Sequence, residues 1–260
     1  MAYELQWGSD KPGHIVFLID LSGSMENKID DVIKAVQNTC KSLVARCMSG
    51  KTLKERVSIS VYGYNYQISE LLQKTPSSIR DLAIALKASA NQPLFDKTKE
   101  AKPEYQTVMR IAFEKAKSDI EQWINQQKKS GITQIPSPIV INISDGFPYE
   151  GKEKDQRQVF AETLNAAREL TSITTPDGNV RLFNIHFDPD SKERALRFPK
   201  TRPDEEHLQF LFDASSPMSE DMINSARTYF NEAEMGSRCM LSNEKEISNL
   251  ARFIEWGSSK

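Results

Sequence analysis

Two short apolar runs, each ending in an aspartate, constrain the fold of this chain more than any other feature. The first spans residues 14–19 and ends at Asp20, before a Ser/Gly turn. The second spans residues 139–143 and leads to Asp145, before a second turn. Continuous β-branched runs of this length predict strands that are buried on both faces, as the strands of a parallel sheet are.

Segments with strand-like and helix-like periodicity alternate along most of the sequence. Besides the two apolar runs, strands are predicted at residues 57–62, 67–72, 180–187 and 208–212. Helical spacing of apolar residues predicts helices at residues 29–48, 77–88, 107–124, 153–170, 219–232 and 243–253. Proline-containing and polar stretches predict loops at residues 91–106 and 190–207. This alternation predicts an α/β fold with one doubly wound, mostly parallel central sheet of about six strands, flanked by helices.

The sequence shows no internal repeat, no low-complexity tract and no change of composition that would mark a domain boundary. We therefore expect all 260 residues to form a single domain. Its core is expected to comprise residues 13–190. The C-terminal strand and helices, residues 205–256, are expected to pack on the same domain.

Charge and cysteine usage narrow the classes of partner and compartment. The net charge is −2, from 34 basic and 36 acidic residues without a block of like charge, so nothing favours nucleic acid or an anionic membrane as partner. The three scattered cysteines are too few for a disulfide framework. Cys40 and Cys47 share one helix face, which predicts small core residues in a reducing compartment. The N-terminus lacks a signal-peptide pattern, so we expect a cytoplasmic protein without a membrane span.

The two aspartates that follow the apolar runs predict a shared ligand site. In a doubly wound sheet, ligands bind at the carboxyl ends of the strands where the strand order reverses, so Asp20 and Asp145 are expected within reach of one ion. Ser22 and Ser24 lie two residues apart, and Gly23 between them tolerates the backbone angles of a tight turn. Carboxylates with neutral hydroxyls form an all-oxygen set that suits Mg²⁺, Mn²⁺ or Ca²⁺ and disfavours zinc or copper.

These motifs resemble the von Willebrand factor A (VWA) domain with its metal-ion-dependent adhesion site. The first element of that site is Asp20-x-Ser22-x-Ser24 after an apolar strand, and it matches in full. The third element matches as Ser-Asp-Gly at residues 144–146, where the family usually has Thr-Asp-Gly. By motif order and by strand and helix alternation, the resemblance covers about residues 13–190.

The middle element of the VWA site is a threonine at the start of a central helix. Thr107 is the best candidate, because an amphipathic helix pattern follows it. The family usually places glycine before this threonine, whereas this chain has Gln106. Thr98 is a weaker rival, because no helix pattern follows it directly. An ordinary helix cap explains Thr107 almost as well.

The resemblance implies a function as well as a fold. The region from residue 208 onward resembles the C-terminal part of small stand-alone bacterial VWA proteins, which are intracellular. The implied ligands of one Mg²⁺ ion (or Mn²⁺ or Ca²⁺), bound directly or through water, are Asp20, Ser22, Ser24, Thr107 and Asp145. An Asp or Glu of a protein partner would complete the octahedron. Family resemblance further implies an adaptor or scaffold that works with AAA+ ATPases of the MoxR type, or with kinase and phosphatase modules.

Other interpretations of the same residues are open at this point. Asp20 and the two serines could cap the following helix, and Asp145 could form only a turn. Asp20 could be the nucleophile of a Mg²⁺-dependent phosphate-ester hydrolase of the haloacid dehalogenase type, but such enzymes have a second aspartate where this chain has Ser22. The sequence has no nucleophile elbow, Walker A loop or dinucleotide fingerprint. We therefore predict a binding protein rather than an enzyme, with a structural VWA protein whose site is unoccupied as the third hypothesis.

Three further features near the predicted rim have a functional and a packing interpretation. Asp188 and Asp190 could supply a second metal ligand, but a solvated acidic loop is favoured. His186 lies among alternating apolar residues, which favours a packed core histidine over a ligand. Three alternating tyrosines could line a partner surface or pack as ordinary strand residues: Tyr62, Tyr64 and Tyr66.

Overall fold

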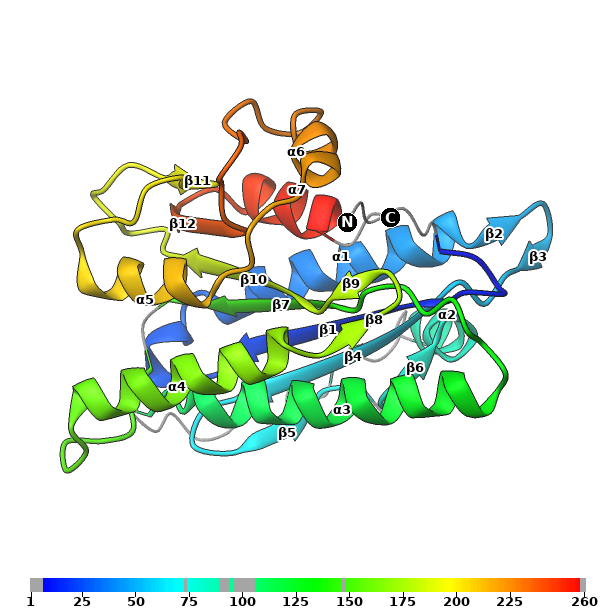
Figure 1. The fold of residues 1–260 in the computed structure, drawn as a ribbon, viewed down its shortest axis with the longest axis horizontal. Helices are drawn as coiled ribbons and strands as arrows, with labels where there is room; N and C mark the ends of the chain where they lie inside the picture. Colours follow the sequence, from blue (N-terminus) through cyan, green and yellow to red (C-terminus); the bar gives the residue numbers. More distant parts are fainter. Residues whose placement is uncertain (1–6, 73, 89–93, 96–105, 146–147, 258–260) are drawn as a thin grey trace.

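The computed structural model describes residues 7–72, 74–88, 94–95, 106–145 and 148–257, and its centre is one twisted sheet with helices on both faces (Figure 1). The strands of this sheet are β1 (Gly13–Asp20), β4 (Val57–Tyr64), β5 (Ile68–Glu70), β6 (Ser77–Ser78), β7 (Ile139–Ser144), β10 (Arg181–Phe187), β11 (Leu196–Arg197) and β12 (Met240–Glu244). The helices are α1 (Ile29–Arg46), α2 (Ile79–Ala88), α3 (Met109–Lys129), α4 (Gln156–Thr171), α5 (Glu206–Ala214), α6 (Glu220–Ala226) and α7 (Ile247–Gly257). Two small hairpins pair β2 (Met48–Ser49) with β3 (Thr52–Leu53) and β8 (Thr174–Thr175) with β9 (Gly178–Asn179).

The order of the strands reverses once, beside β1. Across the sheet the order is β11-β12-β10-β7-β1-β4-β5, with β6 paired to β4. The five longer strands β1, β4, β7, β10 and β12 are parallel, and β5, β6 and β11 are short antiparallel additions. The chain builds outward from β1 through β4 and β5, then crosses β1 and continues through β7, β10 and β12. This is a doubly wound sheet whose switch point lies between β1 and β7, so the predicted fold class is confirmed.

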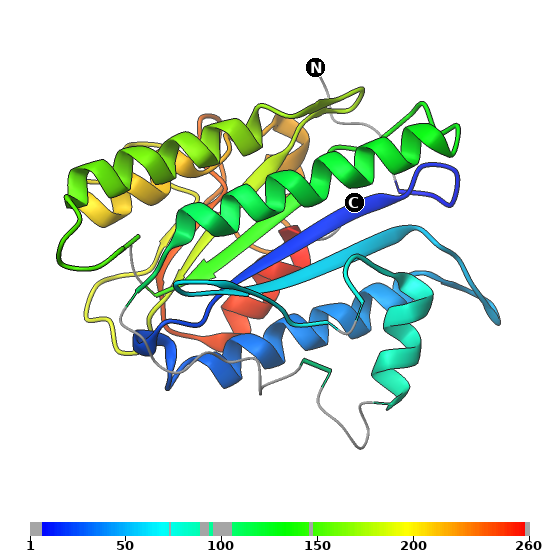
Figure 2. The same ribbon diagram turned by 90° about the horizontal axis from the view of Figure 1, so that it is seen from below.

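Each face of the sheet carries its own apolar core. Ile15, Phe17 and Ile19 of β1 pack with α1, α2, α6 and α7. Val16 and Leu18 point to the opposite face and pack with α3, α4 and α5. Figure 2 shows the two layers, with α3 and α4 on one side of the sheet and α1 and α7 on the other. Burial of both faces explains why the first strand is a continuous apolar run and not an alternating one.

The segment at residues 208–212 is helical, so the strand predicted there is wrong. It lies inside α5, where Leu208, Leu211 and Phe212 fall at helical spacing and are all buried. A short apolar run has the same signature in a buried helix and in a buried strand, and periodicity alone cannot separate the two. In α5 this spacing places the apolar side chains on one face of the helix, and that face packs against α4 and the sheet.

The last parallel strand is β12, which the sequence does not reveal. The helix predicted at residues 243–253 begins only at Ile247, and the helix predicted at residues 219–232 ends at Ala226. β12 has only five residues, two of them polar and one acidic, and it is buried because it pairs with β10 and β11. The loop predicted at residues 91–106 falls mostly outside the described residues.

The cysteines and the helices bear on two further predictions. Cys40, Cys47 and Cys239 are all buried with free thiols, which confirms that Cys40 and Cys47 are core residues. In the described ranges, none of the helices combines the length and the apolar character that crossing a membrane requires.

Replacing Ile141 in β7 with alanine is expected to lower the free energy of unfolding by about 2–5 kcal/mol, because the deletion leaves a cavity at the centre of the sheet. Ile141 is 0% exposed, whereas Ile84 on α2 is 61% exposed. Ile84→Ala is therefore the matched control, with an expected change within about 0.5 kcal/mol. Urea unfolding followed by circular dichroism measures both. Equal losses in the two variants would contradict the central position of β7.

Candidate functional site

The turn after β1 is anchored at the carboxyl edge of the sheet. Asp20 is the last residue of β1 and is 0% exposed. Its Oδ1 accepts a hydrogen bond from the N–H of Ser22 at 2.8 Å. The N–H of Leu21 donates to the carbonyl of Tyr64 at 2.7 Å, which ties the turn to the end of β4. A single 3₁₀ turn, η1 (Gly23–Met25), then leads towards α1.

Hydrogen bonds join this turn to the end of the neighbouring strand β7. Ser24 Oγ donates to Asp145 Oδ1 at 2.9 Å and lies 3.1 Å from Ser22 Oγ. Because a hydroxyl carries one hydrogen, Ser22 Oγ is the donor in the second contact. The structure therefore brings together four of the five predicted ligands, Asp20, Ser22, Ser24 and Asp145.

The two serines do not act as helix caps. Ser22 precedes η1 but its side chain makes no capping hydrogen bond. The helix α1 begins at Ile29 with Lys28 in the capping position, again without a side-chain bond. The hydroxyl groups of Ser22 and Ser24 instead bond to each other and to Asp145, at the edge where a ligand of a doubly wound sheet would bind.

Lys28 is the residue of this site that the sequence analysis missed. Its Nζ lies 2.6 Å from Asp145 Oδ2 and 3.3 Å from Asp188 Oδ1. Burial lowers the pKa of Lys28, but the bonds to Asp145 and Asp188 outweigh burial and raise the pKa above its usual value. Asp188 is therefore half of an ion pair and not a solvated acid, while Asp190 is exposed. The only signal in the sequence is the position of Lys28, four residues after Ser24.

Thr107 lies at the same edge but is not the first residue of the helix. α3 begins at Met109, and Val108 occupies its capping position. Thr107 forms an isolated bridge with Tyr149, with N–H to O distances of 2.8 and 3.0 Å, and the N–H of Val108 donates to Asn65 O at 2.8 Å. Thr107 thus joins the segments that follow β4 and β7. Among the described residues its hydroxyl makes no hydrogen bond to the serines, and the helix-cap interpretation is wrong.

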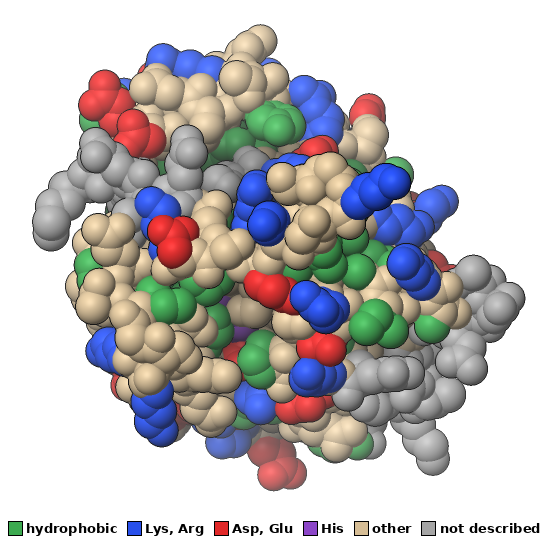
Figure 3. All heavy atoms as spheres, turned by 90° about the vertical axis from the view of Figure 1, so that its right-hand side faces the viewer, with side chains coloured by type: hydrophobic (Ala, Val, Ile, Leu, Met, Phe, Trp, Pro, Cys, Tyr) green, Lys and Arg blue, Asp and Glu red, His purple; other side chains and the backbone are tan. Residues whose placement is uncertain are grey.

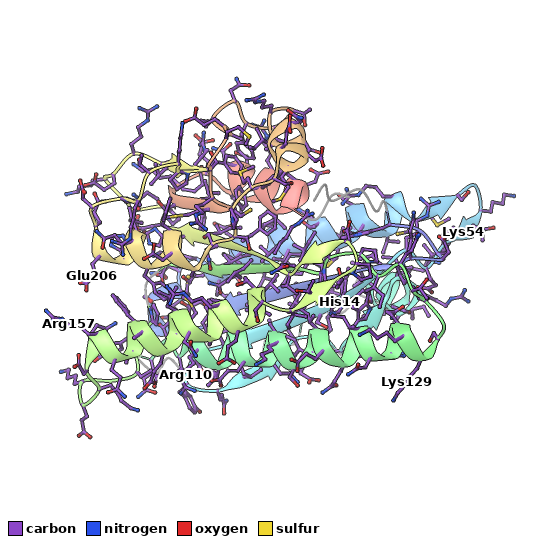
Figure 4. The ribbon with its side chains drawn as sticks, viewed as in Figure 1. His14, Lys54, Arg110, Lys129, Arg157 and Glu206 are labelled. Atoms are coloured by element: carbon purple, nitrogen blue, oxygen red, sulfur yellow. The ribbon has the colours of Figure 1, made fainter. Side chains whose placement is uncertain are left out.

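Thr98, the rival for the same role, lies outside the described residues, and so do Gly146 and Phe147 after Asp145. The helices α3, α4 and α5 all begin at this edge, as the labelled residues Arg110, Arg157 and Glu206 show at one end of Figure 4. The amino ends of helices carry partial positive charge, so this edge favours acidic groups.

The carboxyl group of Asp20 is fully buried. Burial raises its pKa to about 7, although bonds from Ser22 oppose the shift, and the charge of Asp145 adds to it. Its Oδ2 is buried and has no hydrogen-bond partner in the described part of the chain. A buried carboxylate oxygen in this position needs a proton, a water or a cation. The donor set of two carboxylates and neutral hydroxyls fits a hard divalent cation.

Across the described ranges, no group of three or more His, Cys, Asp or Glu side chains could hold a metal.

His186 supports the backbone of the site. Its Nε2–H donates to the carbonyl of Asp145 at 3.0 Å, and its Nδ1 accepts the N–H of Asn243 at 3.3 Å. Burial lowers the pKa of His186, which keeps the ring neutral. The packed-histidine interpretation is confirmed, with the added role of holding the backbone of Asp145.

A line of buried polar side chains crosses the sheet beneath the site. Tyr64 Oη donates to Asn142 Oδ1 at 2.8 Å, and Asn142 Nδ2 donates to Asn184 Oδ1 at 3.0 Å. Asn184 Nδ2 then donates to Ser215 Oγ at 3.0 Å. These bonds link β4, β7, β10 and the end of α5, which fixes the spacing of the strand ends. Tyr64 and Tyr62 are buried and Tyr66 is 41% exposed, so the three tyrosines do not form one rim surface.

Neither a protein-family profile nor a curated protein matches the chain. Solved structures similar to it include the manganese-loaded TRAP protein of Plasmodium vivax, with 22% identity over 68% of this chain and 57% of that chain and a TM-score of 0.43. The pilus adhesin SpaC of Lactobacillus rhamnosus GG has 13% identity over 79% and 27% of the two chains and a TM-score of 0.47. A von Willebrand factor type A structure from Catenulispora acidiphila has 14% identity over 69% and 34% and a TM-score of 0.42.

This chain spans between 27% and 57% of those three chains. Likeness at this level concerns the fold alone and says nothing about ligands or partners. The strand order of the chain itself shows the doubly wound fold, and two aspartate turns meet at its switch point.

Replacing Asp20 with asparagine is expected to remove a pH dependence of stability. Because burial raises the pKa of Asp20 from 3.8 to about 7, the folded protein keeps a proton that the unfolded chain releases. Without metal, this stabilisation is full below about pH 4 and is lost as the pH rises through about 7, a change of about 3 kcal/mol between about pH 5 and 8.

Urea unfolding in EDTA at several pH values measures the effect. The Asp20→Asn protein should lack this slope, whereas Asp190→Asn, a change at an exposed aspartate, should keep it. Parallel pH profiles of the wild type and the Asp20→Asn protein would show that Asp20 is not the titrating group.

Proposed function

We propose that this protein is a metal-dependent protein-binding module, with one Mg²⁺ ion held between the ends of β1 and β7. Ser22 and Ser24 would bind the ion directly, and Asp20 and Asp145 would hold it directly or through water. Thr107 would join them from its bridge with Tyr149. The observation that carries the proposal is Asp20 Oδ2, which is buried and has no hydrogen-bond partner among the described residues, on the turn that also carries the Ser22 and Ser24 hydroxyls.

The local charges support a divalent cation. The carboxylates of Asp20, Asp145 and Asp188 carry three negative charges when ionised, and Lys28 offsets one of them. The remaining two charges match a divalent ion, so its binding would leave the site close to neutral. A carboxylate of a partner could then complete the coordination without facing a strongly negative surface.

The contact between Lys28 and Asp145 has a second effect on the proposed binding. Lys28 Nζ donates a hydrogen bond to Asp145 Oδ2 at 2.6 Å. It therefore competes for one of the two carboxylate oxygens to which a metal-bound water could donate. Lys28 would therefore keep Asp145 oriented while the metal is absent, at the expense of some metal affinity. After binding, the same positive charge would lie near the incoming carboxylate and attract it.

Burial counts against the alternative of a phosphate-ester hydrolase. A nucleophilic Asp20 would have to reach a phosphorus atom, yet its side chain is 0% exposed and its Oδ1 accepts the Ser22 N–H. Ser22 occupies the position where such enzymes carry their second aspartate. We therefore favour binding over catalysis.

We further propose that the partner is a protein that presents an Asp or Glu, within a cytoplasmic multi-protein system. The three buried free thiols fit a reducing compartment. Within this proposal, an AAA+ ATPase or a kinase and phosphatase system is the class of partner that the VWA resemblance implies.

Titration calorimetry with MgCl₂ tests the ligands. Ser24→Ala is expected to weaken Mg²⁺ binding about 10–100-fold. Lys28→Met is expected to strengthen it, because the ammonium group no longer competes for Asp145. Lys34→Met, at an exposed position of α1, is the matched control and should bind like the wild type. Unchanged binding in the Ser24→Ala protein would contradict the site, and no binding of Mg²⁺, Mn²⁺ or Ca²⁺ to the wild type would favour a structural protein.

Affinity capture from a lysate of the native host, with and without EDTA, tests the metal bridge. The wild type should retain a partner only without chelator, and the Asp20→Ala protein should retain it in neither condition. Asp190→Ala is the control and should behave like the wild type. A partner retained equally in the presence of EDTA and by the Asp20→Ala protein would rule out a bridge through the metal. Turnover of a phosphate ester with Mg²⁺ would favour the hydrolase instead.

A further inference from the structure

A polar pocket of about 350 Å³ lies at the amino-terminal edge of the sheet, away from the Asp20 turn. Three arginines from three different elements line it: Arg168 in the last turn of α4, Arg181 at the start of β10 and Arg238 before β12. Figure 3 shows the molecule from the side of this edge, where Lys and Arg side chains are interspersed with Asp and Glu. The volume falls within the range of small-molecule sites, about 300–1,000 Å³.

The described residues that line this pocket carry an excess of positive charge. Asp213 is the one acidic residue among them. Its carboxylate is held by Arg202, with Nε 3.1 Å from each oxygen and Nη2 2.7 Å from Oδ2. Arg202 itself does not line the pocket, so the one acidic residue among the described lining residues is already paired with an arginine outside it.

Arg238 is held in place before any ligand arrives. Arg238 Nη1 donates to the carbonyl of Ser215 at 3.1 Å, and its guanidinium group lies over the ring of Phe212 at 5.1 Å. Arg181 also lines the pocket and is 3% exposed. The charges of Arg181 and Arg238 also converge on Cys239, where they act against the burial that raises the pKa of the thiol to about 12.

We propose that this pocket binds a small phosphate-bearing molecule, with the phosphate group held by Arg181 and Arg238. The planar fork of a guanidinium group can donate to two phosphate oxygens at once, and several arginines suit a dianion better than a single negative charge. Ser216 Oγ accepts the N–H of Leu182 at 2.9 Å, so its own hydrogen is available to a phosphate oxygen. Arg168, exposed at the rim, contacts the outer part of the ligand.

Sodium diphosphate, titrated by calorimetry in the presence of EDTA, is the test probe, because EDTA keeps the metal site out of the measurement. Wild-type protein is expected to bind it saturably. Arg238→Gln should weaken binding about 10-fold or more, as expected for the loss of charged hydrogen bonds. Arg168→Gln should weaken it several-fold, and since Arg168 is exposed this variant keeps the test valid if Arg238→Gln fails to fold.

Arg157→Gln is the matched control, because Arg157 is exposed at the opposite end of the same helix α4 (Figure 4), and it should bind like the wild type. Titrations of sodium phosphate and of adenosine monophosphate distinguish a free inorganic anion from a phosphate ester, and binding of either supports the site. Three results would overturn it: heat and thermal shift reproduced by sodium chloride at equal ionic strength, malonate bound as tightly as diphosphate, or wild-type affinity in both Arg168→Gln and Arg238→Gln.

Discussion

The parallel pairing of β1 with β4 on one side and β7 on the other is the constraint on which the rest of the structure depends. The register places Asp20 opposite Tyr64 and Ile19 opposite Ile143, so the three strands end level. For that reason a serine on one turn reaches a carboxylate 121 residues further along the chain. A slip of one residue would exchange the two faces of β1 and separate these groups.

The sequence predicts those parts of the fold that depend on local pattern. Residues 14–19 and 139–143 could be recognised because strands buried on both faces are rich in apolar and β-branched residues, and Asp20 and Asp145 follow the ends of these runs. The meeting of Ser24 with Asp145 could also be anticipated, since parallel strands that flank a switch point present their ends together. Whether the group holds a metal stays a prediction.

The features that the sequence does not predict depend on contacts between distant segments. α5 has the composition of a buried strand, and only its packing against α4 and the sheet selects the helix. β12 lacks an apolar run, yet pairing with β10 buries it. In the sequence Lys28 resembles an ordinary solvated residue. Only the fold brings it into contact with Asp145 and Asp188, which follow the ends of β7 and β10. In each case the partner that decides the outcome is more than 30 residues away in the chain or belongs to another element.

The buried polar line beneath the site has a direction. From Tyr64 through Asn142 and Asn184 to Ser215, every side chain donates forward, and Ser215 Oγ finally donates to the carbonyl of Leu211. Neither amide in this line can turn over alone, because a reversed Asn142 would place two amide oxygens against each other and a reversed Asn184 two amide NH₂ groups. The orientation of the Asn142 side chain therefore fixes that of the Asn184 side chain, so β7 and β10 share one internal hydrogen-bond arrangement beneath the site.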